Sequence, residues 1–142
     1  MMRFLRKKPD DGIWQELNKS VIRLTKEGSF DQATAMALEL LKVSKKNYGK
    51  WHEKTVKALN NLGYICTMKK DFEDAESYLL LGLQVSEKVY GKISREVAFV
   101  NMNLAKLYMA KADDINSIEK TFREHKHYSA ETEETHASPV SG

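Results

Sequence analysis

The sequence predicts an all-α fold built from stacked helical hairpins, and three observations carry that prediction. The two prolines, Pro9 and Pro139, lie near the ends, so the strongest helix breaker is missing between them. Apolar residues recur at the spacing of one helix face, and small residues interrupt the apolar faces at regular intervals. Part of the chain also repeats itself. Together these features favour about five or six helices.

The repeat has a period of 42 residues: residues 28–33 (GSFDQA) match residues 70–75 (KDFEDA), and residues 43–50 match residues 85–92. A third copy opens with Asn103, Leu104 and Ala105 and fades after Ala110. The predicted organisation is a flexible basic leader at 1–12, a repeat domain at 13–128 and a disordered acidic tail at 129–142. Within the domain, the repeats lie near 14–55, 56–97 and 98–128, and the last includes a degenerate capping helix.

In the first repeat, the sequence predicts helices at 13–27 and 30–47. The first has an apolar stripe, and the second has a stripe that includes small residues (Trp14, Leu17, Val21, Leu24; Phe30, Ala33, Ala37, Leu40). Small residues on a stripe let paired helices approach closely. Ser29 and Gln32 have the spacing of a capping box, and Gly49 follows the second helix where a left-handed cap is expected.

In the second repeat, apolar stripes with small residues predict helices at 52–69 and 72–89. Asp71 is the expected N-cap, Gly91 is the expected C-terminal cap, and His52 starts the first helix. In the third repeat we expect helices at 94–111 and 114–127, with Asp113 and Asp114 at the N-cap. The last helix has only a thin apolar stripe on a charged surface, which suits the polar terminal cap that stacked repeats need (Ile115, Ile118, Phe122).

These positions resemble the pattern of the tetratricopeptide repeat family (Leu59, Leu62, Gly63, Cys66, Phe72, Ala75, Leu79, Gly82). The longer period, the string at 58–63 (ALNNLG) and the Tyr-Gly pairs at 48–49 and 90–91 resemble the kinesin light chain subtype of that repeat. The resemblance implies a right-handed α-α superhelix whose first helices line a concave groove. It also implies a non-enzymatic adaptor or scaffold that binds a peptide or helix of another protein.

Transferred by position, the resemblance assigns a set of residues to the protein-binding groove, with Gln15 and Lys19 beside them (Asn18, Ile22, Lys57, Asn60, Asn61, Tyr64, Met68, Phe99, Met102, Asn103, Lys106). Asn side chains can bond an extended backbone as donor and as acceptor, and Met and Tyr offer adaptable apolar contact. The alternative function is structural: exposed terminal repeat faces would join copies of the chain into homo-oligomers.

Few residues suggest chemistry. His125 and His127 do not share a helix face, so we expect no metal site, and Cys66 lies on an apolar stripe as a small buried residue. We expect no cofactor, no catalytic residues and no nucleic-acid partner. The basic N-terminus has no apolar segment after it, which argues against a signal peptide and leaves only weak contact with an anionic membrane. A cytoplasmic location is the expectation.

Overall fold

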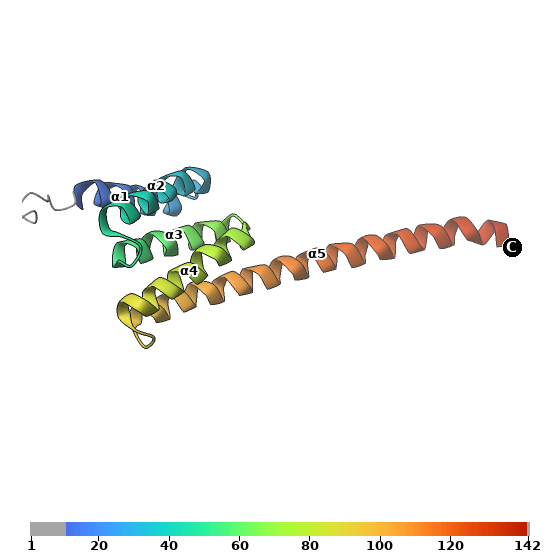
Figure 1. Ribbon diagram of the computed structural model, residues 1–142. Coiled ribbons are helices and arrows are strands. Elements are labelled where there is room, and N and C mark those ends of the chain that lie inside the picture. The colour runs from blue at the N-terminus through green and yellow to red at the C-terminus, as the bar shows by residue number, and fades with distance from the viewer. Residues whose placement is uncertain (1–10, 142) are drawn as a thin grey trace, which may run out of the picture. The chain divides into compact units, whose positions relative to one another are not determined.

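The computed structural model describes residues 11–141, with side chains through residue 125, and it confirms an all-α helical-repeat fold. Its helices are α1 (Asp11–Lys26), α2 (Phe30–Tyr48), α3 (Glu53–Met68), α4 (Phe72–Tyr90) and α5 (Arg95–Ser141) (Figure 1). The chain divides after Tyr108 into two compact units, so α1–α4 and the start of α5 form the first. The predicted leader lies outside the described residues except for its last two, which begin α1.

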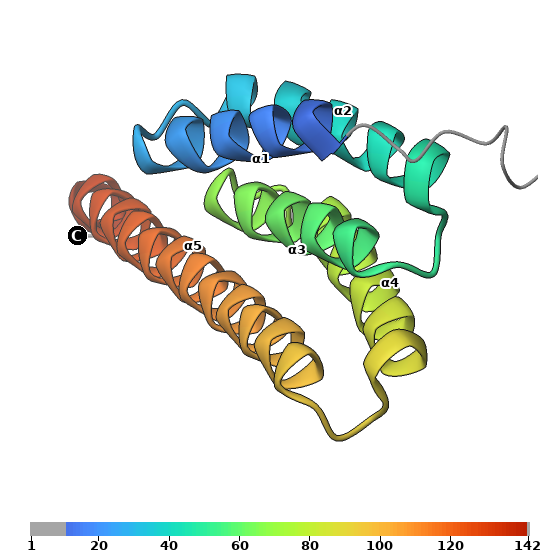
Figure 2. The same ribbon diagram turned by 90° about the vertical axis from the view of Figure 1, so that its left-hand side faces the viewer.

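The first unit consists of two helical hairpins and the beginning of a third. Helix α1 pairs with α2, α3 pairs with α4, and α2 also contacts α3. The turn between α1 and α2 lies at the opposite end of the hairpin from the linker between α2 and α3 (Figure 2). Both hairpin turns contain a residue with a left-handed backbone, Gly28 with φ 76° and Lys70 with φ 66°. That conformation reverses the chain within three residues.

The predicted apolar stripes form one core. Trp14, Val21 and Leu24 are buried from α1, and their stripe meets the small buried residues Ala33 and Ala37 of α2. Side chains of α3 and α4 continue this core, and the start of α5 closes it (Leu59, Leu62, Ile65, Leu79, Val85, Val100, Leu104, Leu107). The first two repeats bury equivalent faces, so the two complete hairpins cover each other.

The ends of α1–α4 lie within about two residues of the predicted positions, but the predicted capping box is wrong. Ser29 and Asp71 are N-caps without a side-chain cap bond. Their φ and ψ, −83° and 66° for Ser29 and −84° and 68° for Asp71, lie away from the extended backbone of ordinary N-caps. His52 caps α3 instead, since its Nδ1 accepts a hydrogen bond from the Lys54 amide at 3.1 Å. Gly49 caps α2 with a positive φ of 90°, as predicted.

The third repeat differs from the prediction. The expected helices at 94–111 and 114–127 are one helix of 47 residues, so Asp113 and Asp114 lie inside α5 and not at the start of a helix. No Gly or Pro occurs from residue 95 to 138, and the position of the left-handed Lys70 holds Ala112, whose residue type has the highest helix propensity. The helix continues through the range of the predicted tail, with no helix end near residue 128.

Helices α3 and α4 are closest at Gly63. A Cβ atom added there would lie 2.3 Å from both Cγ and Cδ2 of Leu79, which is completely buried. The matching positions of the first hairpin, 42 residues earlier, hold Val21 and Ala37, which are also buried. The larger residue of the pair therefore lies on the second helix in one hairpin (Leu79) and on the first helix in the other (Val21). Both pairs have the same number of side-chain carbon atoms.

Replacement of Gly63 by Ala is expected to destabilise the protein. Overpacking a core costs about 1–3 kcal/mol, which exceeds the ~1 kcal/mol that Ala gains over Gly within a helix. Urea unfolding followed by circular dichroism measures the difference in the free energy of unfolding.

Gly82→Ala is the matched control, because a Cβ atom there would lie 3.5 Å from the Leu59 Cβ, an ordinary contact. It should keep or raise stability. The double variant Gly63→Val with Leu79→Ala copies the first hairpin, so it should lose less than the two single changes added together. A Gly63→Ala protein as stable as Gly82→Ala would contradict the close approach.

Candidate functional site

The first helices of the repeats line a groove in the first unit. Two hollows of about 370 Å³ and 390 Å³ adjoin there, and they share Ile22 of α1, Asn60 and Asn61 of α3, and Phe99 of α5. Ile22 is 43% exposed and Phe99 is 53% exposed. The groove therefore has an accessible apolar side chain on α1 and another on α5, with the polar surface of α3 between them.

Most of the residues that the sequence assigns to the groove line these hollows (Asn18, Ile22, Lys57, Asn60, Asn61, Tyr64, Phe99, Asn103, Lys106). Met68 and Met102 are exposed but line neither hollow. Gln15 is also outside them, and Lys19 borders a separate shallow hollow along α1. The structure thus brings together nine of the predicted residues around the two hollows and leaves Met68 and Met102 outside them.

The sequence analysis missed nine residues that line the hollows. They lie on α1, at the end of α4 and near the starts of α3 and α5 (Val21, Thr25, Lys26, Glu53, Val56, Tyr90, Arg95, Glu96, Val100). One signal was present, because Glu53 and Arg95 occupy the same repeat position, 42 residues apart. Extending the predicted face by one turn toward the N-terminus would have found them.

The asparagines of the groove bond to one another between repeats. Asn61 Nδ2 donates to Asn18 Oδ1 at 3.3 Å, and Asn103 Nδ2 donates to Asn60 Oδ1 at 2.7 Å, with 43 residues between partners in both pairs. Asn60 and Asn103 are buried. Burying an amide costs free energy unless it has hydrogen-bond partners. Some of the asparagine side chains of the groove therefore hold neighbouring first helices together.

Charged side chains surround the apolar positions. Lys26, Lys57, Arg95 and Lys106 line the hollows, against two carboxylates (Glu53, Glu96). Glu53 also accepts a hydrogen bond from the Tyr90 hydroxyl at 3.4 Å, and burial together with the two carboxylates raises the pKa of that phenol. The groove lining therefore has an excess of positive charge, which favours a negatively charged ligand.

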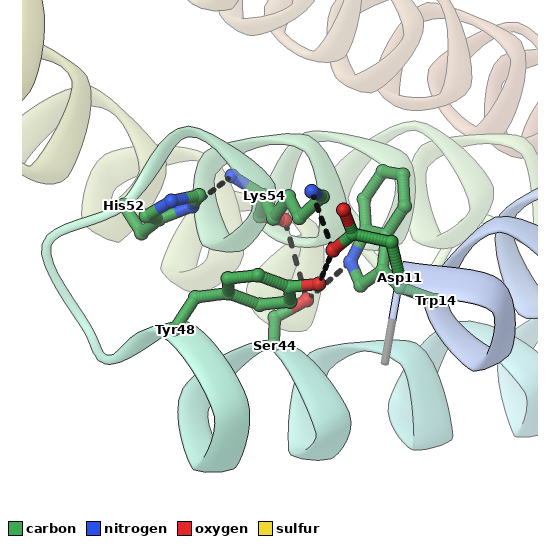
Figure 3. Close-up of polar contacts among 6 residues, drawn as sticks. All are labelled: Asp11, Trp14, Ser44, Tyr48, His52 and Lys54. Carbon is green, nitrogen blue, oxygen red and sulfur yellow. Dashed lines mark hydrogen bonds and ion pairs between the residues drawn. The ribbon is translucent and has the colours of Figure 1, made fainter. Parts of the chain in front are cut away.

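A polar cluster fastens the N-terminus of α1 to α2 and α3 (Figure 3). The Tyr48 hydroxyl donates to the Asp11 carboxylate, and Lys54 Nζ pairs with the same oxygen at 3.2 Å. Lys54 Nζ also lies 4.4 Å from the ring centroid of Tyr48. Beneath this pair, the buried Trp14 donates from Nε1 to Ser44 Oγ at 2.7 Å. These contacts lie within the fold and act as a structural clamp.

The structure places the cysteine and the histidines that the sequence analysis considered as candidates for chemistry. Among them, no three His, Cys, Asp or Glu side chains come together as metal ligands. Burial raises the pKa of the Cys66 thiol to about 11, so the nucleophilic thiolate is scarce at neutral pH. His125 is exposed on α5, and the side chain of His127 lies outside the described part.

No protein-family model matches the chain, and no curated protein is significantly similar to it in sequence. Across residues 11–141, no helix combines the length and the apolar character needed to cross a bilayer.

The Asp11 clamp predicts acid sensitivity. The hydrogen bond from Tyr48 and the pairing with Lys54 lower the pKa of Asp11 below its ordinary 3.8. A carboxylate with a lowered folded pKa contributes stability above its unfolded pKa and loses it as the pH falls through the folded value. Melting temperatures from pH 5 to below pH 3 should therefore fall less steeply for Asp11→Asn than for the native protein. Glu16→Gln, a change at an exposed surface pair, is the control.

Proposed function

We propose that this chain is a tetratricopeptide-type adaptor that binds a short peptide or one helix of another protein in the groove of its first unit. The observation that carries the proposal is the pair of adjoining hollows with Ile22 and Phe99 exposed at their shared centre. Exposed apolar side chains that gather in a hollow are typical of interaction sites.

The lining suggests the chemistry of the bound segment. An apolar side chain of the ligand would lie against Ile22 and Phe99, and acidic residues beside it would meet Lys57, Arg95 and Lys106. The groove has only three first helices as walls, so it suits a short segment. A cytoplasmic adaptor fits a chain whose one cysteine, Cys66, is an unpaired buried thiol.

Removal of the two apolar side chains, Ile22 and Phe99, should weaken the binding of a peptide in the groove. A library of random peptides displayed on phage is selected on the full chain, and the best peptide is labelled and titrated by fluorescence anisotropy. The double variant Ile22→Ser with Phe99→Ser should raise the dissociation constant of that peptide by at least about tenfold, which corresponds to ~1.4 kcal/mol of binding free energy. Both side chains are exposed, so the helical circular dichroism should not change.

Met68→Ser with Met102→Ser is the matched control, because these methionines are as exposed as the anchors but lie outside the hollows. The control should bind within about twofold of the native chain. Equal losses of peptide affinity in both double variants would show that the peptide binds elsewhere. A library that yields no peptide with saturable binding would contradict peptide binding in the groove.

A further inference from the structure

The linkers that follow the two hairpins share one sequence pattern and lie at one end of the first unit. They are residues 49–52 (GKWH), between α2 and α3, and residues 91–94 (GKIS), between α4 and α5. The repeat offset of 42 pairs Lys50 with Lys92 and Trp51 with Ile93. Both linkers lie on the left of Figure 1, where α1 also begins, and Figure 2 looks onto this end. We call it the linker end.

Each linker exposes one large apolar side chain. Ile93 is 100% exposed and Trp51 is 41% exposed. Neither lines the two hollows of the groove or the shallow hollow along α1. A hollow receives the side chains of a ligand, whereas an exposed side chain on a linker can itself enter a deformable surface. The two apolar side chains therefore suit insertion into such a surface.

Two lysines contact the ring of Trp51. Lys88 Nζ, from the last turn of α4, is 4.0 Å from the centroid of that ring, and Lys50 Nζ is 4.7 Å from it. An indole has an apolar body and one N–H donor, so Trp is enriched where a bilayer meets water. Lysines beside it can place their stems in apolar surroundings and keep their ammonium groups at the level of the phosphates. This combination is typical of a membrane interface.

Cations predominate among the charged side chains of the linker end. Lys54 and Asp11 pair with each other at 3.2 Å, so their charges cancel. The other charged side chains of residues 45–54 and 87–96 are six exposed cations and three carboxylates (Lys45, Lys46, Lys50, Lys88, Lys92, Arg95; Glu53, Glu87, Glu96). The sequence before α1 adds four cations and one carboxylate (Arg3, Arg6, Lys7, Lys8; Asp10). An excess of positive charge attracts an anionic lipid surface.

We propose that the linker end docks the chain on an anionic lipid bilayer, with Trp51 and Ile93 inserted among the headgroups and the lysines around them on the lipid phosphates. A bilayer accepts exposed apolar side chains without a matching pocket, and its anionic lipids complement the cations. Apolar insertion and charge attraction add in the binding free energy, so both are required for the full affinity. This inference is independent of groove binding, which rests on Ile22 and Phe99.

Tryptophan fluorescence of the full chain measures docking on vesicles of mixed phosphatidylcholine and phosphatidylserine. Trp14 is buried and Trp51 is exposed, so a blue shift of the emission, and its quenching by lipids with brominated acyl chains, report Trp51. Both changes should appear with these vesicles. With phosphatidylcholine alone, the apparent dissociation constant should be at least about tenfold higher. Unchanged emission with the anionic vesicles overturns the proposal, and so does equal binding to both kinds of vesicle.

Vesicle sedimentation of variants tests the apolar side chains. Trp51→Ser with Ile93→Ser should raise the dissociation constant for the anionic vesicles by at least about tenfold. Ile93→Glu alone, at a completely exposed position, should raise it by at least about fivefold while the contacts of Trp51 remain. Leu38→Ser with Leu80→Ser is the matched control, because these residues are also 42 apart and are 45% and 46% exposed, but lie within α2 and α4. Equal losses in the control and the linker variants overturn the proposal.

The position of the charges is tested at constant net charge. Lys50→Gln with Lys92→Gln should raise the same dissociation constant by at least about tenfold. Lys19→Gln with Lys42→Gln removes as much charge from within α1 and α2, so its loss should be smaller. Equal losses would show that net charge alone attracts the chain, which overturns docking by the linker end.

Two other sources of binding have separate readouts. If deletion of residues 2–8 abolishes vesicle binding while the linker variants bind as the native chain does, the contact lies in the N-terminal segment alone and the proposal is overturned. Polyglutamate in solution replaces the bilayer by an acidic polypeptide. It should bind more weakly than the anionic vesicles and leave the emission of Trp51 unshifted, and an equal affinity with the same blue shift overturns the lipid assignment.

Discussion

The contact between the first and second helix of each hairpin is the constraint on which the rest of the structure depends. At Gly63 the two helices are so close that no side chain fits opposite Leu79. The first hairpin meets the same constraint with Val21 on the first helix and Ala37 on the second. Because interiors are closely packed, a large residue on one helix requires a small one on the other. This explains why the repeats differ in sequence while they keep one geometry.

The groove follows from that packing. Second helices take up the apolar faces of the first helices, so the first helices present their remaining faces together. The pairs Asn61–Asn18 and Asn103–Asn60 then fix neighbouring first helices in register. These amides therefore stabilise the packing of the helices as well as line the groove. The exposed apolar side chains Ile22 and Phe99 are the ones accessible to a ligand.

How far sequence predicts this structure depends on the range of the interaction. Periodicity and the repeat offset predicted four helices nearly to their ends. The family resemblance assigned nine of the eighteen residues that line the two hollows. Glu53 and Arg95 were missed because the position transfer began one turn too late. The capping box at Ser29 failed because its backbone angles, which the residue types do not set, determine whether the side chain reaches the amide.

The continuity of α5 was the largest error, and it has a different origin. Asp113 and Asp114 have good cap chemistry, but a cap ends a helix only where the backbone also turns, and Ala112 favours continuation. Because the chain does not turn back, the start of α5 has one face in the groove and another face that no second helix covers. Phe99 forms a wall of the groove, while Ala98 and Ala105 on the same helix have lost the cover that α3 has.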